Sequence, residues 1–152
     1  MGEGQVSTVI RAMEKNENLV GKLYQVYAEK YPEWHVFWSI IAAEEDVHAQ
    51  WLAGLAREIE QGTMVISVER FDLKAVQLFS QYLEQLLKEA QAPDLPVSKA
   101  MRCAYDIENA LIEKKLFEIV SEKQSKYRMV VQRLQEATEI HRHKISEALA
   151  SM

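Results

Sequence analysis

The sequence predicts an all-α protein of four long helices, with a shorter helix in one long connection between the second and the third. Apolar residues recur at steps of three and four along almost all of the 152 residues, which is the period of an amphipathic helix. With only 5 Gly and 3 Pro, few residues interrupt such helices. Residues 65–68, Val-Ile-Ser-Val, form the single strand-like run, and this run is too short and isolated to predict a sheet.

A proline separates the first two long helices. The first is expected over about residues 7–31, because Pro32 disfavours helical geometry in the residue before it. The second begins at Pro32 or Glu33 and ends near Gln61, where Gly62 suits a C-cap. Together these helices predict an antiparallel pair in the first half of the chain.

The second half begins after a connection at residues 63–71. A shorter helix is expected over about residues 72–91, and residues 92–96 contain two prolines that interrupt the helical pattern. The third long helix runs from Ser98, its expected cap, to about Glu122. The fourth covers about residues 126–150. The long connection lets the third helix take a direction that a tight hairpin forbids.

Each long helix carries polar residues in the middle of its apolar stripe. Burying a bare carboxylate costs several kcal/mol, and several carboxylates at one level also repel one another. Two divalent metal ions would supply the missing positive charge. The polar residues in the four stripes are Glu17, then Glu45 and His48, then Glu108, then Thr138 and His141.

The spacing within the second helix adds a chemical reason. Residues three apart project from one helix face, so Glu45 and His48 are directed at one point. Carboxylates can bridge two metals, and imidazole can complete the coordination of each. The two halves of the chain also repeat one pattern, a helix with a central Glu followed by a helix with a central His.

Alternatives exist for three of these positions. Glu14 could replace Glu17, although apolar residues flank it less well. Glu113 could replace Glu108, and Lys115 is placed to pair with a carboxylate. His141 could be a core histidine that is hydrogen-bonded to Thr138 or a tyrosine. The remaining histidines and Cys103 have simpler roles, since His35 and His143 are expected at the surface and Cys103 as a buried thiol.

Three segments resemble the rubrerythrin branch of the ferritin-like superfamily. They are Glu17 followed seven residues later by Tyr24, residues 42–49 (AAEEDVHA), and residues 104–108 (AYDIE). In that superfamily two helices each give a Glu and two others each give an ExxH motif around a di-metal centre. The resemblance implies a ferritin-like four-helix bundle with a long crossover, forming a single domain over residues 1–152. It implies Glu17, Glu45, His48, Glu108 and His141 as the metal ligands.

Thr138 departs from the family pattern, which has Glu three residues before the last histidine. A hydroxide, a bound anion, or Glu136 or Glu139 could supply the missing negative charge. The site could also hold one metal or none. The implied cofactor is a pair of irons, with manganese or zinc as alternatives.

The resemblance implies an oxidoreductase that acts on peroxide or O₂, by peroxide reduction or ferrous oxidation. An iron-binding or storage protein, or a helical scaffold with a degenerate metal site, is the alternative. The single Cys103 cannot build a rubredoxin-type centre, so the electron donor is expected to be another protein. We also expect a homodimer, because such bundles often pair through their helices.

Composition excludes several other classes. The net charge is −5 and no cluster of Lys and Arg forms the basic stripe of a nucleic-acid-binding protein. No apolar run reaches the ~18 residues that a membrane span requires. The N-terminal residues lack the basic and apolar regions of a signal peptide. We therefore expect a cytoplasmic protein.

Overall fold

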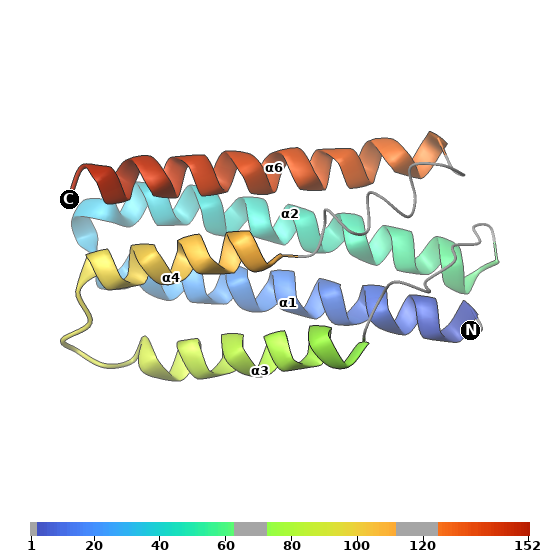
Figure 1. The fold of residues 1–152 in the computed structure, drawn as a ribbon, viewed down its shortest axis with the longest axis horizontal. Helices are drawn as coiled ribbons and strands as arrows, with labels where there is room; N and C mark the ends of the chain where they lie inside the picture. Colours follow the sequence, from blue (N-terminus) through green and yellow to red (C-terminus); the bar gives the residue numbers. More distant parts are fainter. Residues whose placement is uncertain (1–2, 63–72, 112–124) are drawn as a thin grey trace. The chain divides into compact units, whose positions relative to one another are not determined.

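A computed structural model describes residues 3–62, 73–111 and 125–152 of the chain. Within these ranges the secondary structure consists of α-helices and one 3-10 turn (Figure 1), so the predicted all-α class is confirmed. The chain divides into two compact units, Met1–Gln91 and Ala92–Met152, and we describe each by itself. The single ferritin-like domain over residues 1–152 stays a prediction.

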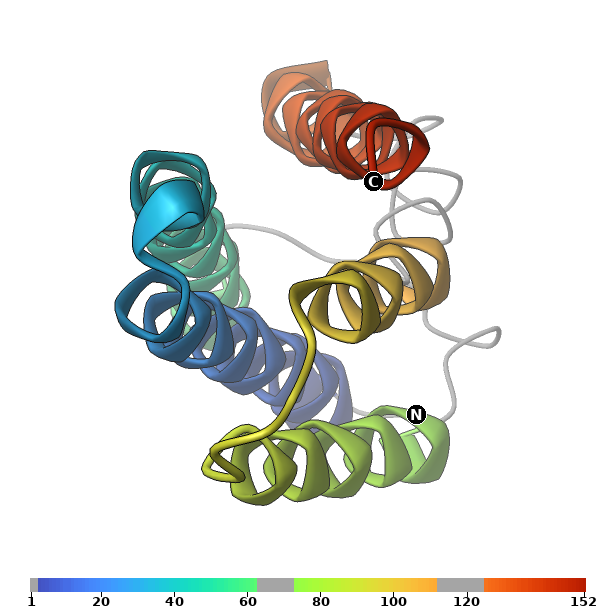
Figure 2. The same cartoon turned by 90° about the vertical axis from the view of Figure 1, so that its left-hand side faces the viewer.

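The described residues of the first unit form three α-helices. Helix α1 packs against both α2 and α3, and it lies between them in the end view (Figure 2). Helices α1 and α2 run in opposite directions, as the proline between them predicted (Figure 1). The elements are α1 (Glu3–Lys30), the 3-10 turn η1 (Pro32–Trp34), α2 (His35–Glu60) and α3 (Leu73–Glu89).

The turn between α1 and α2 follows from its proline. Tyr31 has φ −118° and ψ 88°, which is the extended geometry that a following proline favours. His35 Nδ1 lies 2.9 Å from the carbonyl oxygen of Ala28 and ties the start of α2 to the end of α1. At the other end of α2, Gly62 follows the C-cap residue Gln61 with φ 76°, a backbone conformation that glycine adopts without a steric cost.

The core of the first unit is aromatic at one end. Trp38 is fully buried, and its ring centroid lies 5.4 Å from that of Tyr24 and 4.9 Å from that of Tyr27. Phe37 meets the same indole edge-on at 5.2 Å. Each such pair contributes about 0.5–1.5 kcal/mol beyond its buried area, so these rings fix how α1 and α2 pack. The predicted inward stripes of both helices are buried except at Trp34, which is half-buried.

A buried polar contact joins α1 to α3. The Asn16 amide donates a hydrogen bond to the carbonyl oxygen of Val76 at 3.2 Å. The Ser80 hydroxyl contacts Asn16 Oδ1 and also lies 3.2 Å from the Val76 carbonyl oxygen. Asn16 and Ser80 are each 5% exposed. Asn16 precedes Glu17 in the chain, so this contact helps to set the rotation of α1 beside a predicted metal ligand.

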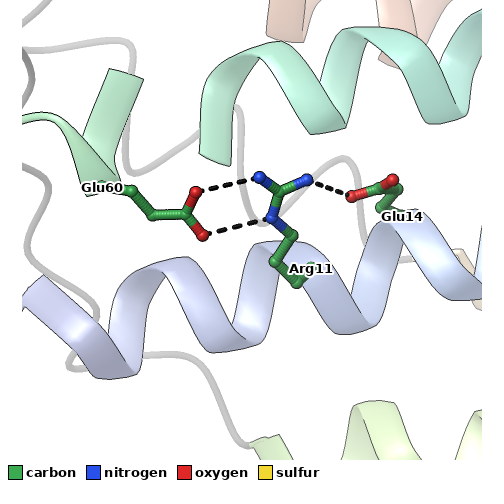
Figure 3. A network of polar contacts seen from close by, with 3 residues as sticks. All are labelled: Arg11, Glu14 and Glu60. Carbon is green, nitrogen blue, oxygen red and sulfur yellow. Dashed lines mark hydrogen bonds and ion pairs between the residues drawn. The ribbon is translucent and has the colours of Figure 1, made fainter. Parts of the chain in front are cut away.

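An exposed ion pair joins the start of α1 to the end of α2 (Figure 3). Arg11 Nη2 lies 2.9 Å from Glu60 Oε1, Arg11 Nε lies 3.2 Å from Glu60 Oε2, and Arg11 Nη1 lies 2.9 Å from Glu14 Oε1. The hydrogen bond to Arg11 lowers the pKa of Glu60, and the same bond raises the pKa of Arg11. The pair is solvent-exposed, so its contribution to stability is small.

The second unit contains α4 (Val97–Ala110) and α6 (Ser125–Ala150), which pack against each other and run in opposite directions (Figure 1). The expected cap at Ser98 is wrong. The N-cap is Pro96, with φ −68° and ψ 146°, and no side chain caps the helix. The Pro96 carbonyl accepts from the N–H groups of Lys99 and Ala100 instead. The fixed φ of proline favours this start, and Ser98 lies inside the first turn.

The predicted end of the third long helix is also wrong. Helix α4 ends at Ala110, and Leu111 has an extended backbone with φ −62° and ψ 137°. Neither Gly nor Pro marks this end, so the apolar period alone predicted continuation. The rest of the predicted helix, at residues 112–122, lies outside the described residues, as do Glu113, Lys115 and the strand-like run at residues 65–68.

In the part of the chain that the structure describes, every helix is too short or too polar to cross a membrane. His35 and His143 are exposed, as expected, and His143 lies 2.9 Å from Glu147 on the surface of α6. Cys103 is half-buried rather than fully buried.

Candidate metal centre

The first unit brings three of the predicted ligands together. Glu17 comes from α1, and Glu45 and His48 come from successive turns of α2. Their side chains are 2%, 0% and 3% exposed. His48 Nδ1 lies 3.3 Å from Glu45 Oε2 and 4.0 Å from Glu17 Oε2. Two carboxylates from two helices thus converge on one imidazole nitrogen, as the i, i+3 spacing and the packing of α1 on α2 require.

These separations suit a metal. Ligand nitrogens and oxygens lie about 2.0–2.2 Å from a metal such as zinc, so two of them in one coordination sphere are about 3.0–3.5 Å apart. The contact of His48 with Glu45 falls in this range, and that with Glu17 is slightly longer. Carboxylate oxygen and imidazole nitrogen are donors that iron, manganese and zinc accept. The donor set of the first unit therefore fits a bound cation.

Two neighbours support this group of side chains. The His48 imidazole stacks on the Trp51 indole, with ring centroids 5.5 Å apart and an angle of 27° between the planes. Gly21 of α1 faces α2 closely, because a Cβ placed there would lie 3.5 Å from the Ala42 carbonyl oxygen and 3.6 Å from Glu45 Cβ. A small residue at position 21 lets α1 approach α2 beside Glu45. Trp51 follows His48 by three residues, so the same spacing rule would have found it.

The second unit contains a matching pair. Glu108 comes from α4 and His141 from α6, and both are buried. His141 Nδ1 lies 3.3 Å from Glu108 Oε1, the same separation that His48 Nδ1 has from Glu45. Each unit thus holds a buried contact between a carboxylate and Nδ1 of a histidine. In the predicted repeat of the two halves, the counterpart of this pair is Glu17 with His48, whose atoms Oε2 and Nδ1 lie 4.0 Å apart, so the repeat stays a prediction.

Thr138 takes the place that Glu45 has in the first unit. It lies three residues before His141 and is buried, with 9% exposure. Its hydroxyl donates to the Leu134 carbonyl oxygen at 2.9 Å, a bond to its own helix that threonine often makes. The hydroxyl is therefore engaged with the backbone as a donor, and it carries no negative charge that could replace that of a carboxylate.

The alternative carboxylates differ in where they lie. Glu14, the alternative to Glu17, is half-buried and contacts Arg11. Glu136 and Glu139 are exposed on α6, and Glu136 accepts a hydrogen bond from Gln132 at 3.1 Å. Glu139 lines a small pocket together with Thr138 and Glu108.

Comparisons of the chain with protein-family models, with curated proteins and with solved structures give no match. The fold and the site therefore define only a class. It is an all-helical protein with buried Glu and His side chains that could hold a metal, and Glu45, His48 and His141 are buried residues that each offer a ligand atom.

Proposed function

We propose that this protein is a di-iron carboxylate protein of the rubrerythrin-like, ferritin-like type, and that it acts on peroxide or O₂. Glu17, Glu45, His48, Glu108 and His141 are the proposed ligands. One observation carries the proposal, namely that each unit contains a buried carboxylate placed 3.3 Å from Nδ1 of a histidine. Treating the two pairs as one ligand set rests on the sequence pattern of the four helices.

Burial of these carboxylates makes a purely structural role without metal energetically unfavourable. A carboxylate loses several kcal/mol of hydration when it enters the interior, and a single histidine offsets this only with good geometry and further hydrogen bonds. The first unit buries two carboxylates, Glu17 and Glu45, at one histidine. Replacing such groups by apolar residues is often neutral or stabilising, so their presence favours a role in binding.

The chemistry follows from the donor set. Peroxide needs two electrons and two protons to become two waters, and a bound pair of ferrous ions would supply the two electrons. The chain supplies the environment: the carboxylates balance the charge, the imidazoles complete the coordination, and burial keeps bulk water away. Electrons must then return from outside, and we propose a separate donor protein for this step. We also propose a homodimer, which sedimentation velocity would test.

The first test is metal content. The protein is purified without added metal, loaded anaerobically with Fe²⁺, desalted and measured by elemental analysis. We expect two irons per chain, with loss of binding in the Glu45→Ala, His48→Ala double variant and in the Glu108→Ala, His141→Ala double variant. His143→Ala is the matched control, because His143 is an exposed histidine of α6, and it should keep both irons.

The outcomes separate the alternatives. Two irons that disappear in both double variants would support one site that needs both units. If each double variant lost only one of the two irons, the proposal that both pairs form one ligand set would be overturned. No iron in the wild type would overturn the proposal and leave a helical scaffold. Iron that stays reduced when peroxide or O₂ is added would overturn the enzyme and support storage or delivery.

A further inference from the structure

The second unit contains a small pocket at the position where the family pattern has a fourth carboxylate. It has a volume of about 110 Å³ and is lined by side chains of α4 and α6. Glu108, a proposed ligand, lies on its wall beside Thr138. A water molecule takes about 30 Å³ in the liquid, so the pocket has room for about three waters. The other lining residues are Asn109, Leu111, Gln135, Glu139 and Arg142.

Thr138 is what leaves this space open. Glutamate at position 138 would add atoms on the same side of α6, as Glu45 does three residues before His48 in the first unit. The Thr138 hydroxyl turns back to the Leu134 carbonyl oxygen and so occupies little of the space. Threonine in place of the glutamate of the family pattern at position 138 thus also leaves space for the pocket next to Glu108.

The lining favours a neutral, hydrogen-bonding molecule. It contains two acidic residues, Glu108 and Glu139, and one basic residue, Arg142, which disfavours a free anion. Arg142 is also engaged, since its Nη1 donates to Asn109 Oδ1 at 3.0 Å. Gln135 and Asn109 add amides that can donate and accept. The volume admits a molecule of two or three heavy atoms and excludes one that carries an aromatic ring.

We propose that this pocket is the entrance through which a small neutral substrate of the size of hydrogen peroxide reaches Glu108, and that Thr138 sets its size limit. The part of this proposal that concerns the substrate rests on the proposed function. The part that concerns access of small molecules to the pocket does not depend on a bound metal. It assigns Thr138 a role in selectivity, whereas the resemblance marks position 138 only as a lost ligand.

Thiol labelling of the metal-free protein tests access. Cys103, the single cysteine, is first replaced by serine, and Thr138→Cys, Val131→Cys or Lys144→Cys is then introduced. All three positions lie on α6; Val131 is fully buried and Lys144 is exposed. Methyl methanethiosulfonate is the small reagent, and fluorescein maleimide is the large one.

We expect the small reagent to modify Thr138→Cys at least about tenfold faster than Val131→Cys, because local opening limits reaction at a buried thiol. The large reagent should modify Thr138→Cys at least about tenfold more slowly than Lys144→Cys, since the pocket excludes it. Equal rates for Thr138→Cys and Val131→Cys with the small reagent would overturn the entrance. Equal rates for Thr138→Cys and Lys144→Cys with the large reagent would overturn the size limit.

A second measurement tests the substrate. Iron-loaded protein is mixed with hydrogen peroxide or with cumene hydroperoxide, and ferric formation is followed by absorbance. Thr138→Leu, which fills the pocket, should slow the hydrogen peroxide reaction about tenfold with its iron content unchanged. Gln132→Leu is the control and should keep the rate, because Gln132 is an exposed residue of α6 outside the lining of the pocket.

An unchanged rate in Thr138→Leu, or equal rates with both peroxides, would overturn the role of Thr138. If the protein binds no iron, the labelling result still decides whether the entrance exists.

Discussion

The Asn16 amide is the polar group that most directly links the stability of the first unit to its candidate site. Asn16 donates to the Val76 carbonyl oxygen and contacts the Ser80 hydroxyl, and both side chains are almost fully buried. Asn16→Ala removes two hydrogen bonds of about 0.5–1.5 kcal/mol each. We therefore expect it to lower the free energy of unfolding by about 1–3 kcal/mol.

A double-mutant cycle in urea denaturation makes this expectation sharper. Ser80→Ala and Asn16→Ala should each destabilise, because each leaves a buried partner with fewer hydrogen bonds. The double variant should be less destabilised than the two single changes together, by about 1 kcal/mol, because it removes both polar groups at once. Asn18→Ala is the matched control, since Asn18 is an exposed asparagine of α1.

If the losses of stability in the two single variants add within about 0.5 kcal/mol in the double variant, the coupling between Asn16 and Ser80 is refuted. The buried contact between these two side chains would then contribute no pairwise energy. An Asn18→Ala variant as unstable as Asn16→Ala would mean that loss of asparagine from α1, and not loss of the buried contact, causes the effect. Because Asn16 precedes Glu17, Asn16→Ala should also weaken metal binding, which titration with Fe²⁺ would measure.

Three further predictions concern metal, pH and packing. Fe²⁺ at 100 times its Kd should stabilise the protein by about 2.7 kcal/mol. At roughly 2–4 °C per kcal/mol, anaerobic calorimetry should show the Tm rising by about 5–10 °C, and His48→Ala should abolish the rise. The pKa of Glu60 is lowered from its ordinary value of 4.5 by its hydrogen bond to Arg11, so its stabilising effect is present above pH 4.5 and is lost as pH falls through the folded-state pKa. Glu60→Gln should therefore be less stable than wild type at pH 7 and equally stable once Glu60 is protonated, as measured by urea denaturation at a series of pH values. A difference in the free energy of unfolding that persists in acid would contradict this prediction. Gly21→Val should lower the free energy of unfolding by about 1–3 kcal/mol by overpacking against Ala42. Gly21→Ala should not destabilise, because its Cβ meets mainly the movable Asp46 carboxylate at 3.1 Å and alanine favours the helix. Equal losses of stability for the two variants in urea denaturation would contradict the close approach of α1 and α2.

Helix positions and inward faces could be predicted from the sequence because burial imposes the helical period. Glu17, Glu45, His48, Glu108 and His141 are all buried, as their places in the apolar stripes predicted. Helix ends were harder to predict. Pro32 and Gly62 have backbone preferences that predict the ends of the first two helices, but α4 ends before Leu111 without a proline or glycine. Ser98 was predicted as the N-cap, yet the N-cap is Pro96, two residues earlier.

The contacts around the candidate site depend on packing between helices, which spacing along one helix does not determine. The match of Glu45 with His48 follows from the i, i+3 rule, and the stacking of Trp51 on His48 follows from the same rule. The position of Glu17 near His48 requires in addition the close approach of α1 and α2 at Gly21. The pocket beside Thr138 depends on the packing of α4 on α6, so the sequence predicted a departure from the family pattern at position 138 but not the space beside it.

The two buried pairs explain how one fold could exist with and without metal. In each unit a carboxylate oxygen lies 3.3 Å from Nδ1 of a histidine, close to the separation of two ligands on one metal. A direct contact between imidazole and carboxylate and a metal ion between the same atoms would satisfy the same two groups. Under the proposed function, metal binding would replace this direct contact while the side chains keep their places. Under the proposed function, these side chains would need little reorganisation when a metal binds.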